Sequence, residues 1–245
     1  MNAATLDKMK EMKLLGMHRI FKTSLETGIS AAYTPDELIA QLVEAEWDDR
    51  QSRNVEQRIR NARFRYKADI EDLYFHGDRN LDRNQIQQFA DCSFINKAAC
   101  ILITGSTGIG KSYIASALGY RACSLGYRVM YHNVHRLFSM LKMSKTNGSY
   151  SKEIDRIERQ QLLILDDFGL QPLDAQSRAA LMEIVEDRHG KSALIITSQV
   201  PVNKWHEIIG DPTIADAILD RIVHQAYRLE LKGTSLRKSE TPHAA

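Results

Sequence analysis

The chain lacks the features that mark secreted, membrane-spanning and disulfide-rich proteins. Its 245 residues include three cysteines, Cys92, Cys100 and Cys123, whose wide spacing predicts neither a disulfide scaffold nor a zinc finger. No apolar run approaches the roughly 20 residues that a helix needs to span a bilayer. The first residues, MNAATLDKMKEMKLL, are charged throughout and have no apolar signal-peptide core. These absences predict a cytoplasmic protein without a membrane partner.

A large net charge is also missing. Lys and Arg total 33 and Asp and Glu total 31, which leaves a net charge of +2. Such a balance neither requires nor excludes nucleic acid as a partner, so any basic surface must be local. Apolar residues at 43% and charged residues at 26% are ordinary for a globular protein and exclude a wholly disordered chain.

Two regions of different pattern follow one another along the chain. Residues 1–95 predict a small all-α domain, in which Thr34 caps a helix that starts at Pro35, and Glu37 completes a capping box. Apolar residues then follow helical spacing without a breaker toward Arg65. Residues 96–245 alternate short apolar runs with helical patterns, which predicts an α/β domain whose parallel sheet is flanked by helices.

The α/β region resolves into individual segments. We expect strands at 98–104, 128–132, 161–167, 192–199 and 226–231, and helices at 111–124, 134–143, 174–188 and 213–224. The polar segment MSKTNGSYSK, residues 143–152, predicts a mobile loop.

A phosphate-binding loop follows the first of these strands. It consists of Gly105, Ser106, Thr107, Gly108, Ile109, Gly110, Lys111 and Ser112, which match G-x-x-x-x-G-K-[ST] at every fixed position. Glycines let backbone amides face a phosphate, and the following helix adds its positive end. Lys111 is suited to the β- and γ-phosphates of ATP, and the Ser112 hydroxyl to Mg²⁺.

Polar residues also end the two strands that follow. The apolar run Leu162–Leu165 leads into Asp166, a candidate Mg²⁺ residue that acts mostly through water, and Asp167, which could polarise the attacking water. Gln199 ends the next strand, either between the γ-phosphate and the water or as part of a plain turn. Arg221, on a late helix, is either a surface ion-pair residue or an arginine finger for a neighbouring subunit.

A local basic surface is indicated near residue 60. Residues 50–67 contain seven basic residues against the single acid Glu56, with Phe64 and Tyr66 interleaved. The candidates for contact with DNA phosphates are Arg58, Arg60, Arg63, Arg65 and Lys67. From these residues alone, a solvated helix and a phosphate-contacting surface are equal alternatives.

The whole chain resembles the IstB-like ATP-binding proteins, and more distantly the DnaC helicase loaders, both of the AAA+ class. The resemblance rests on KLLGMHRIF (13–21), EWDDR (46–50), RNARF (60–64), the phosphate loop with its flanks, LLILDDFG, IITSQVPVNKW, ILDRIVH and KGTSLR (232–237). No single N-terminal match is decisive, but the order and spacing of all of them are specific.

The resemblance implies an AAA+ ATPase, 96–245, without a full lid, behind an N-terminal domain, 1–95, for DNA binding and assembly. It implies a protein that binds ATP and Mg²⁺, forms homo-oligomers on double-stranded DNA and stimulates a separately encoded transposase. Carried over residue by residue, 105–112 bind ATP, Asp166 is the metal residue and Asp167 takes the catalytic-acid position. Gln199 takes the sensor position, and Arg221 acts in trans.

Three residues depart from the family pattern and bear on the rate of hydrolysis. Asp167 stands where the family often has Glu, Gln199 where it has Asn, and Thr234 where it has Glu. A DnaC-like helicase loader acting in replication is the alternative function, with the same ATPase core. A small-molecule kinase is a third, which the Asp pair and the late Asp-Arg helix fit less well.

Overall fold

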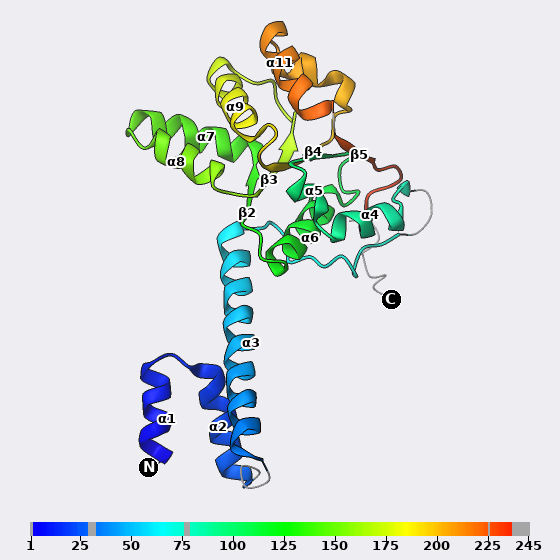
Figure 1. Cartoon of the computed structure of the whole chain (residues 1–245). Coiled ribbons are helices and arrows are strands. Elements are labelled where there is room, and N and C mark those ends of the chain that lie inside the picture. The colour runs from blue at the N-terminus through cyan, green and yellow to red at the C-terminus, as the bar shows by residue number, and fades with distance from the viewer. Residues whose placement is uncertain (1, 29–32, 76–78, 225, 237–245) are drawn as a thin grey trace, which may run out of the picture. The chain divides into compact units, whose positions relative to one another are not determined.

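The structure is a computed structural model that describes residues 2–28, 33–75, 79–224 and 226–236. The chain forms two compact units, Met1–Gln57 and Arg58–Ala245, and the boundary between them falls within one helix, α3 (Figure 1). The helices are α1 (Asn2–Glu11), α2 (Leu15–Thr27), α3 (Pro35–Ala62), α4 (Arg83–Ala90), α5 (Ser93–Asn96), α6 (Lys111–Ser124), α7 (Val134–Thr146), α8 (Tyr150–Glu158), α9 (Ala175–Arg188), η3 (Val202–Lys204), α10 (Trp205–Ile209) and α11 (Pro212–Val223). The strands are β1 (Cys100–Thr104), β2 (Val129–Asn133), β3 (Leu162–Phe168), β4 (Ala193–Ser198) and β5 (Tyr227–Glu230).

The first unit is helical, as predicted, and α3 begins at the predicted capping box. The Thr34 hydroxyl accepts a hydrogen bond from the Glu37 amide at 3.3 Å, and the Glu37 carboxylate accepts one from the Thr34 amide at 2.8 Å. The two groups therefore satisfy amides that the start of a helix leaves without intrahelical partners.

One buried acid joins α2 to α3 in this unit. Glu46 is 5% exposed, and its carboxylate accepts hydrogen bonds from the Gly16 amide at 2.9 Å and from Arg50 Nε at 2.7 Å. Gly16 allows this approach, because a Cβ there would lie 2.2 Å from the Ala45 carbonyl oxygen. A carboxylate at the first turn of α2 also interacts favourably with the helix dipole.

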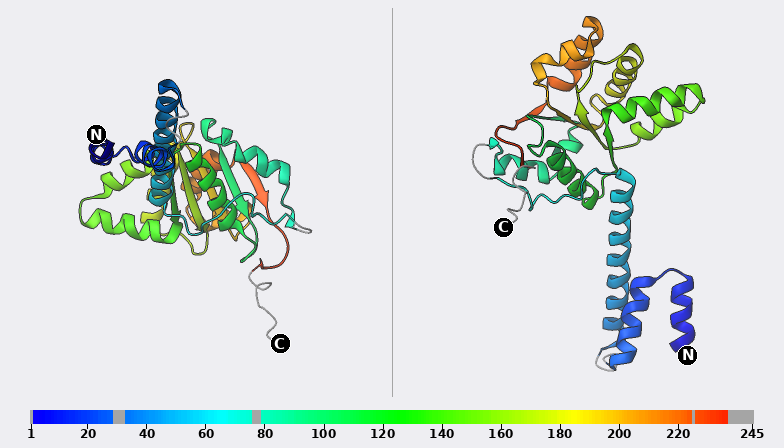
Figure 2. Two further views of the ribbon diagram at one scale, coloured as in Figure 1. Left: turned by 90° about the horizontal axis from the view of Figure 1, so that it is seen from below. Right: turned by 180° about the vertical axis from the view of Figure 1, so that it is seen from behind.

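The second unit contains a five-stranded parallel sheet in the order β2-β3-β4-β1-β5. Figure 2, right, shows α7, α8, α9 and α11 together on one side of the sheet, while α4, α5 and α6 lie on the other. Alternate side chains of each strand enter the two resulting cores. In β1, Ile101 and Ile103 pack with α6, whereas Leu102 packs with α7 and α9. This three-layer arrangement confirms the predicted α/β class.

The expected strand segments are all strands, and the four expected helices are α6, α7, α9 and α11. The loop prediction for 143–152 is wrong, because α7 continues to Thr146 and α8 begins at Tyr150. Ile154 and Ile157 of α8 are buried with α7, so apolar packing on one side outweighs the polar composition of the segment. The helix expected to run toward Arg65 ends at Ala62, where Arg63 takes a φ of 58°.

The two compact units divide the chain at a different point from the predicted division into 1–95 and 96–245. The predicted division concerns DNA binding and ATP hydrolysis, and it stays a proposal. Among the described residues, no helix is both long enough and apolar enough to cross a membrane. The three cysteines are free, and burial raises the pKa of Cys92 and Cys100 to about 11.

We expect Glu46→Ala to destabilise the first unit, because it leaves the first turn of α2 and Arg50 without their shared partner. The loss should be about 1–3 kcal/mol, as for other buried hydrogen-bonded groups. Hydrogen–deuterium exchange of the α2 amides in the full chain measures it. Glu44→Ala, at an exposed position of the same helix, is the matched control and should leave exchange unchanged. Equal exchange in both variants would contradict the role given to Glu46.

The same contacts make this stabilisation depend on pH. Burial alone would raise the pKa of Glu46, but hydrogen bonds from Arg50 and from the Met17 and Gly16 amides lower it below its usual value. A carboxyl whose pKa is lower in the folded state stabilises the fold at neutral pH, and that stability is lost as the pH falls through the lowered value. The protection of the α2 amides, measured as the exchange rate relative to the intrinsic rate at each pH, should therefore fall on acidification in the unmodified protein and not in the Glu46→Ala variant.

Candidate nucleotide-binding site

The predicted ATP residues meet at one edge of the sheet, where the carboxyl ends of parallel strands hold ligands in open α/β folds. A cavity of about 530 Å³ opens there. It is lined by Arg65, Tyr66, Thr107, Gly108, Gly110, Lys111, Ser112, Tyr113, Asp167, Leu170, Gln199 and Leu236. The loop after β1, the acids that end β3 and the glutamine after β4 thus share one pocket.

The loop between β1 and α6 has the backbone that its glycines predict. Gly105, Gly108 and Gly110 have φ values of 146°, 81° and 96°, in the region that other residues rarely adopt. A Cβ on Gly108 would lie 2.1 Å from the Ser235 hydroxyl, so this glycine also makes room for the C-terminal segment. Lys111 is 5% exposed, and its ammonium donates to the carbonyls of Gly105 and Ser106 at 2.8 and 2.7 Å. The backbone carbonyls of the loop therefore fix the position of the Lys111 ammonium beside the pocket.

Asp166 is fully buried and is surrounded by hydrogen-bond donors. The Ser112 hydroxyl donates to it at 2.7 Å, and the hydroxyls of Thr197 and Tyr131 also donate. Burial, and then the neighbouring Asp166 carboxylate, raise the pKa of Tyr131 well above its usual range, so Tyr131 stays a donor. The paired oxygens of Ser112 and Asp166 form the kind of hard oxygen donor set that Mg²⁺ prefers.

Asp167 owes its position to a bulge in β3. The pairing of β3 with β4 shifts register between Leu165 and Phe168, and Asp167 has a φ of 61°. Asp tolerates this conformation better than most residues, although it still stores strain. Without the bulge, successive side chains would point to opposite faces of the sheet. With it, the carboxylate faces the pocket, where Asn133 Nδ2 lies at 3.1 Å.

Gln199 lies in the same pocket, at the end of β4. Its side-chain oxygen accepts a hydrogen bond from the Thr107 hydroxyl at 2.5 Å, which ties β4 to the middle of the phosphate loop. Gln199 therefore stands beside the middle of the phosphate loop and lines the pocket.

Arg221 lies outside this pocket, on the last turn of α11. Its guanidinium donates to the Ala217 carbonyl at 2.8 Å and pairs with Glu186 of α9 at 2.7 Å. It lines a different hollow together with Cys100 and His189, which precede or begin strands at the amino edge of the sheet. Within one subunit, Arg221 is thus remote from the phosphate loop.

The basic residues predicted to contact DNA lie in two different environments in the structure. Arg60, Arg63 and Lys67 are exposed and Arg58 is half-buried. Arg65 instead reaches the nucleotide pocket, where its Nη1 lies 3.0 Å from Asp167 and 3.4 Å from Asp166. The segment that follows α3 therefore contributes a cation to the ATP site.

Sequence reasoning missed several groups of this pocket. Asn133 and Thr197 stand at or next to the ends of β2 and β4, where a polar residue is an ordinary strand ending. Tyr131 lies in the middle of β2, and Arg79 is buried and donates to the Ile109 carbonyl of the loop at 2.5 Å, although no motif marks either residue. The strand-end position of Asn133 and Thr197 was the available signal, because parallel strands end at the same edge.

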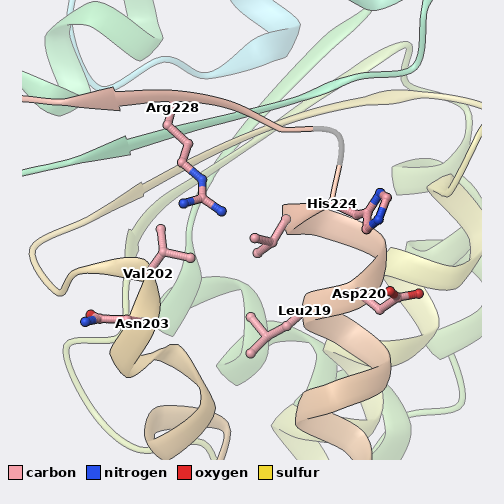
Figure 3. Close-up of a pocket in the computed structure, with 7 residues that line it drawn as sticks. Val202, Asn203, Leu219, Asp220, His224 and Arg228 are labelled. Carbon is pink, nitrogen blue, oxygen red and sulfur yellow. The ribbon is translucent and has the colours of Figure 1, made fainter.

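Another cavity of the second unit lies between η3, α11 and β5 (Figure 3). Val202, Leu219 and Val223 give it a mainly apolar wall, and the Arg228 side chain extends into it. It contains none of the predicted nucleotide residues. The candidate nucleotide site is therefore the pocket at the phosphate loop.

Comparisons with known proteins identify related chains and related folds. The model of the family described as IstB-like ATP binding protein matches residues 7–244. The insertion sequence ATP-binding protein y4pL of Sinorhizobium fredii is 43% identical over 236 residues, which cover 96% of this chain and 96% of that protein. The crystal structure of DnaI covers 68% of this chain and 92% of its own, with a TM-score of 0.60 at 22% identity.

The structure of AMPPCP-bound DnaA from Aquifex aeolicus is similar over 71% of this chain and 53% of that protein, with a TM-score of 0.57 at 18% identity. At such identities the two solved structures establish the fold, a parallel sheet flanked by helices, and no more.

We expect Lys111→Ala to weaken ATP binding at least tenfold, because the buried ammonium would no longer face the β- and γ-phosphates. Titration with a fluorescent ATP analogue measures the dissociation constant. Lys97→Ala, at an exposed position away from the pocket, is the control and should bind as the unmodified protein does. Unchanged affinity in Lys111→Ala would remove the phosphate role from Lys111.

Proposed function

Because this chain belongs to the family of IstB-like ATP-binding proteins, we propose that it is an ATP-dependent, DNA-binding regulator of transposition. It oligomerises on duplex DNA, hydrolyses ATP and stimulates a separately encoded transposase. The observation that carries this proposal is the meeting of 105–112, Asp166, Asp167 and Gln199 in one pocket. This pocket occurs in a chain that closely resembles an insertion sequence ATP-binding protein.

In this proposal, the phosphates of ATP lie in the loop 105–112. Backbone amides and the amino end of α6 face the phosphates, and Lys111 contacts the β- and γ-phosphates. Ser112 and Asp166, whose oxygens lie 2.7 Å apart, would hold Mg²⁺. The metal, when bound, would neutralise charge between the β- and γ-phosphates.

Hydrolysis requires a group that accepts a proton from water. The Asp167 carboxylate takes this proton as the water oxygen bonds to the γ-phosphorus and the bond to the β-phosphate oxygen breaks, which leaves ADP and phosphate. Gln199, held by Thr107, positions the water or the γ-phosphate. The side chain of Asp167 is shorter than that of glutamate, so we expect slow turnover.

Arg221 serves the site of a neighbouring subunit. Its place outside the pocket of its own subunit supports a role in trans. An arginine that completes the ATP site from the next subunit makes ATP favour assembly, and hydrolysis then weakens the interface.

DNA contact involves the basic residues near the end of α3. In the second unit, Arg58 lines a hollow with Arg128 and Arg156, which come from the start of β2 and from α8. Burial, and to a smaller extent Arg156 and Arg63, lower the pKa of His132 to about 4, so His132 adds no positive charge to this surface at neutral pH. Guanidinium groups from three segments suit a phosphate backbone and give affinity without sequence choice.

The decisive experiment is to measure the size of the protein with duplex DNA, single-stranded DNA or no DNA, each with and without ATP. We expect a large assembly that requires both ATP and duplex DNA, since the ATP sites lie between subunits. Light scattering after size-exclusion chromatography measures the mass. Assembly on single strands alone would favour the helicase loader, and a monomer in all conditions would contradict the role of Arg221 in trans.

We expect Arg221→Ala to keep ATP affinity but to lose most hydrolysis and ATP-dependent assembly. Losses of about 10³-fold or more in turnover are typical when such an arginine is removed. Phosphate release and particle mass measure the two effects. Glu186→Ala, which breaks the same ion pair and leaves the arginine in place, is the matched control and should keep both activities. Normal hydrolysis and assembly by Arg221→Ala would rule out the finger.

A further inference from the structure

Arg65 occupies a place that neither the phosphate-loop motif nor the basic segment explains. It lies three residues beyond the end of α3, yet its guanidinium pairs with the two acids that end β3. The functions proposed above leave this contact without a role. It joins the proposed DNA-contacting segment to the metal side of the ATP pocket.

Phe64, which precedes Arg65, anchors the segment that follows α3. The Phe64 ring lies 4.7 Å from the Tyr120 ring and 6.2 Å from the Tyr131 ring, measured between centroids. Gly119 of α6 makes room for it, because a Cβ there would lie 2.3 Å from the Phe64 ring. The chain turns at Arg63 with a φ of 58° just before this anchor. Arg65 therefore starts from a fixed backbone position beside the pocket.

The charges in the pocket give Arg65 two possible partners. Without nucleotide, Asp166 and Asp167 place two carboxylates side by side, and Arg65 Nη1 lies 3.4 and 3.0 Å from them. The Arg65 side chain is 42% exposed, so it has room to move. A planar guanidinium pairs equally well with a carboxylate and with a phosphate.

ATP changes which partner is favoured. In the proposed site, the γ-phosphate of ATP would lie near Lys111 and Asp167, and Ser112 and Asp166 would hold Mg²⁺, whose charge would disfavour a second cation beside Asp166. ADP brings no γ-phosphate to this point, so Arg65 keeps its pair with the acids. The Arg65 guanidinium would therefore contribute to the binding free energy of ATP and not to that of ADP.

We propose that Arg65 is a nucleotide-binding residue that distinguishes ATP from ADP, by transfer of its guanidinium from the Asp166–Asp167 pair to the γ-phosphate. This rests on the proposed ATP site.

The test compares the affinities of Arg65→Gln for fluorescent ATP and ADP analogues in the presence of Mg²⁺. A charge-assisted hydrogen bond that ATP alone receives corresponds to a loss of roughly tenfold or more in ATP affinity. We expect that loss for ATP and little change for ADP. Arg65→Lys keeps the charge and should retain part of the preference for ATP. Arg83→Gln, at an exposed position outside the pocket, should change neither affinity.

Two results would overturn the proposal. Equal losses for ATP and ADP would make Arg65 a structural residue, and unchanged affinities would remove it from the nucleotide site. Circular dichroism of both Arg65 variants shows whether they fold, and Arg65→Lys carries the test if Arg65→Gln does not. If the unmodified protein bound neither nucleotide, the proposed function would fail with it. Binding that Lys111→Ala weakens and Arg65→Gln does not would overturn this inference alone.

Discussion

The buried carboxylate of Asp166 is the constraint on which the nucleotide pocket depends. A charged group without contact with water is costly unless donors surround it, and here β2, β4, α6 and the segment after α3 each supply one. Four elements that are distant in sequence must therefore meet at one point. The position of β3 in the sheet serves the same requirement, since its two neighbours, β2 and β4, both supply a donor to the acid.

The parts of the site that sequence reasoning could identify are those with local causes. The phosphate loop follows from fixed glycine and lysine positions, and the start of α3 follows from Thr34 and Glu37, which contact each other across a single turn. The strands of the sheet follow from short apolar runs that are buried on both faces. Each of these features depends on interactions within a few residues, so it can be predicted from the sequence without knowledge of the fold.

The remaining features depend on contacts between distant segments. The place of Arg65 follows from Phe64 packing beside Gly119, more than fifty residues along the chain, and nothing near Arg65 marks it. The bulge that turns Asp167 into the pocket depends on pairing with β4. Segment 143–152 looks like a loop by composition and is mostly helical, because Ile154 and Ile157 pack into a shared core. Tertiary packing decided these features.

The C-terminal segment on the phosphate loop has a consequence for synthesis. Gly105 faces the Leu231 carbonyl, Gly108 faces Ser235, and the Leu236 amide donates to the Gly108 carbonyl at 3.0 Å. β5, which pairs with β1, is also synthesised long after the loop. A ribosome thus exposes the complete loop motif well before the residues that support it. A nascent or truncated chain that ends before residue 231 carries every motif residue of an ATP site but lacks the packing that shapes the loop.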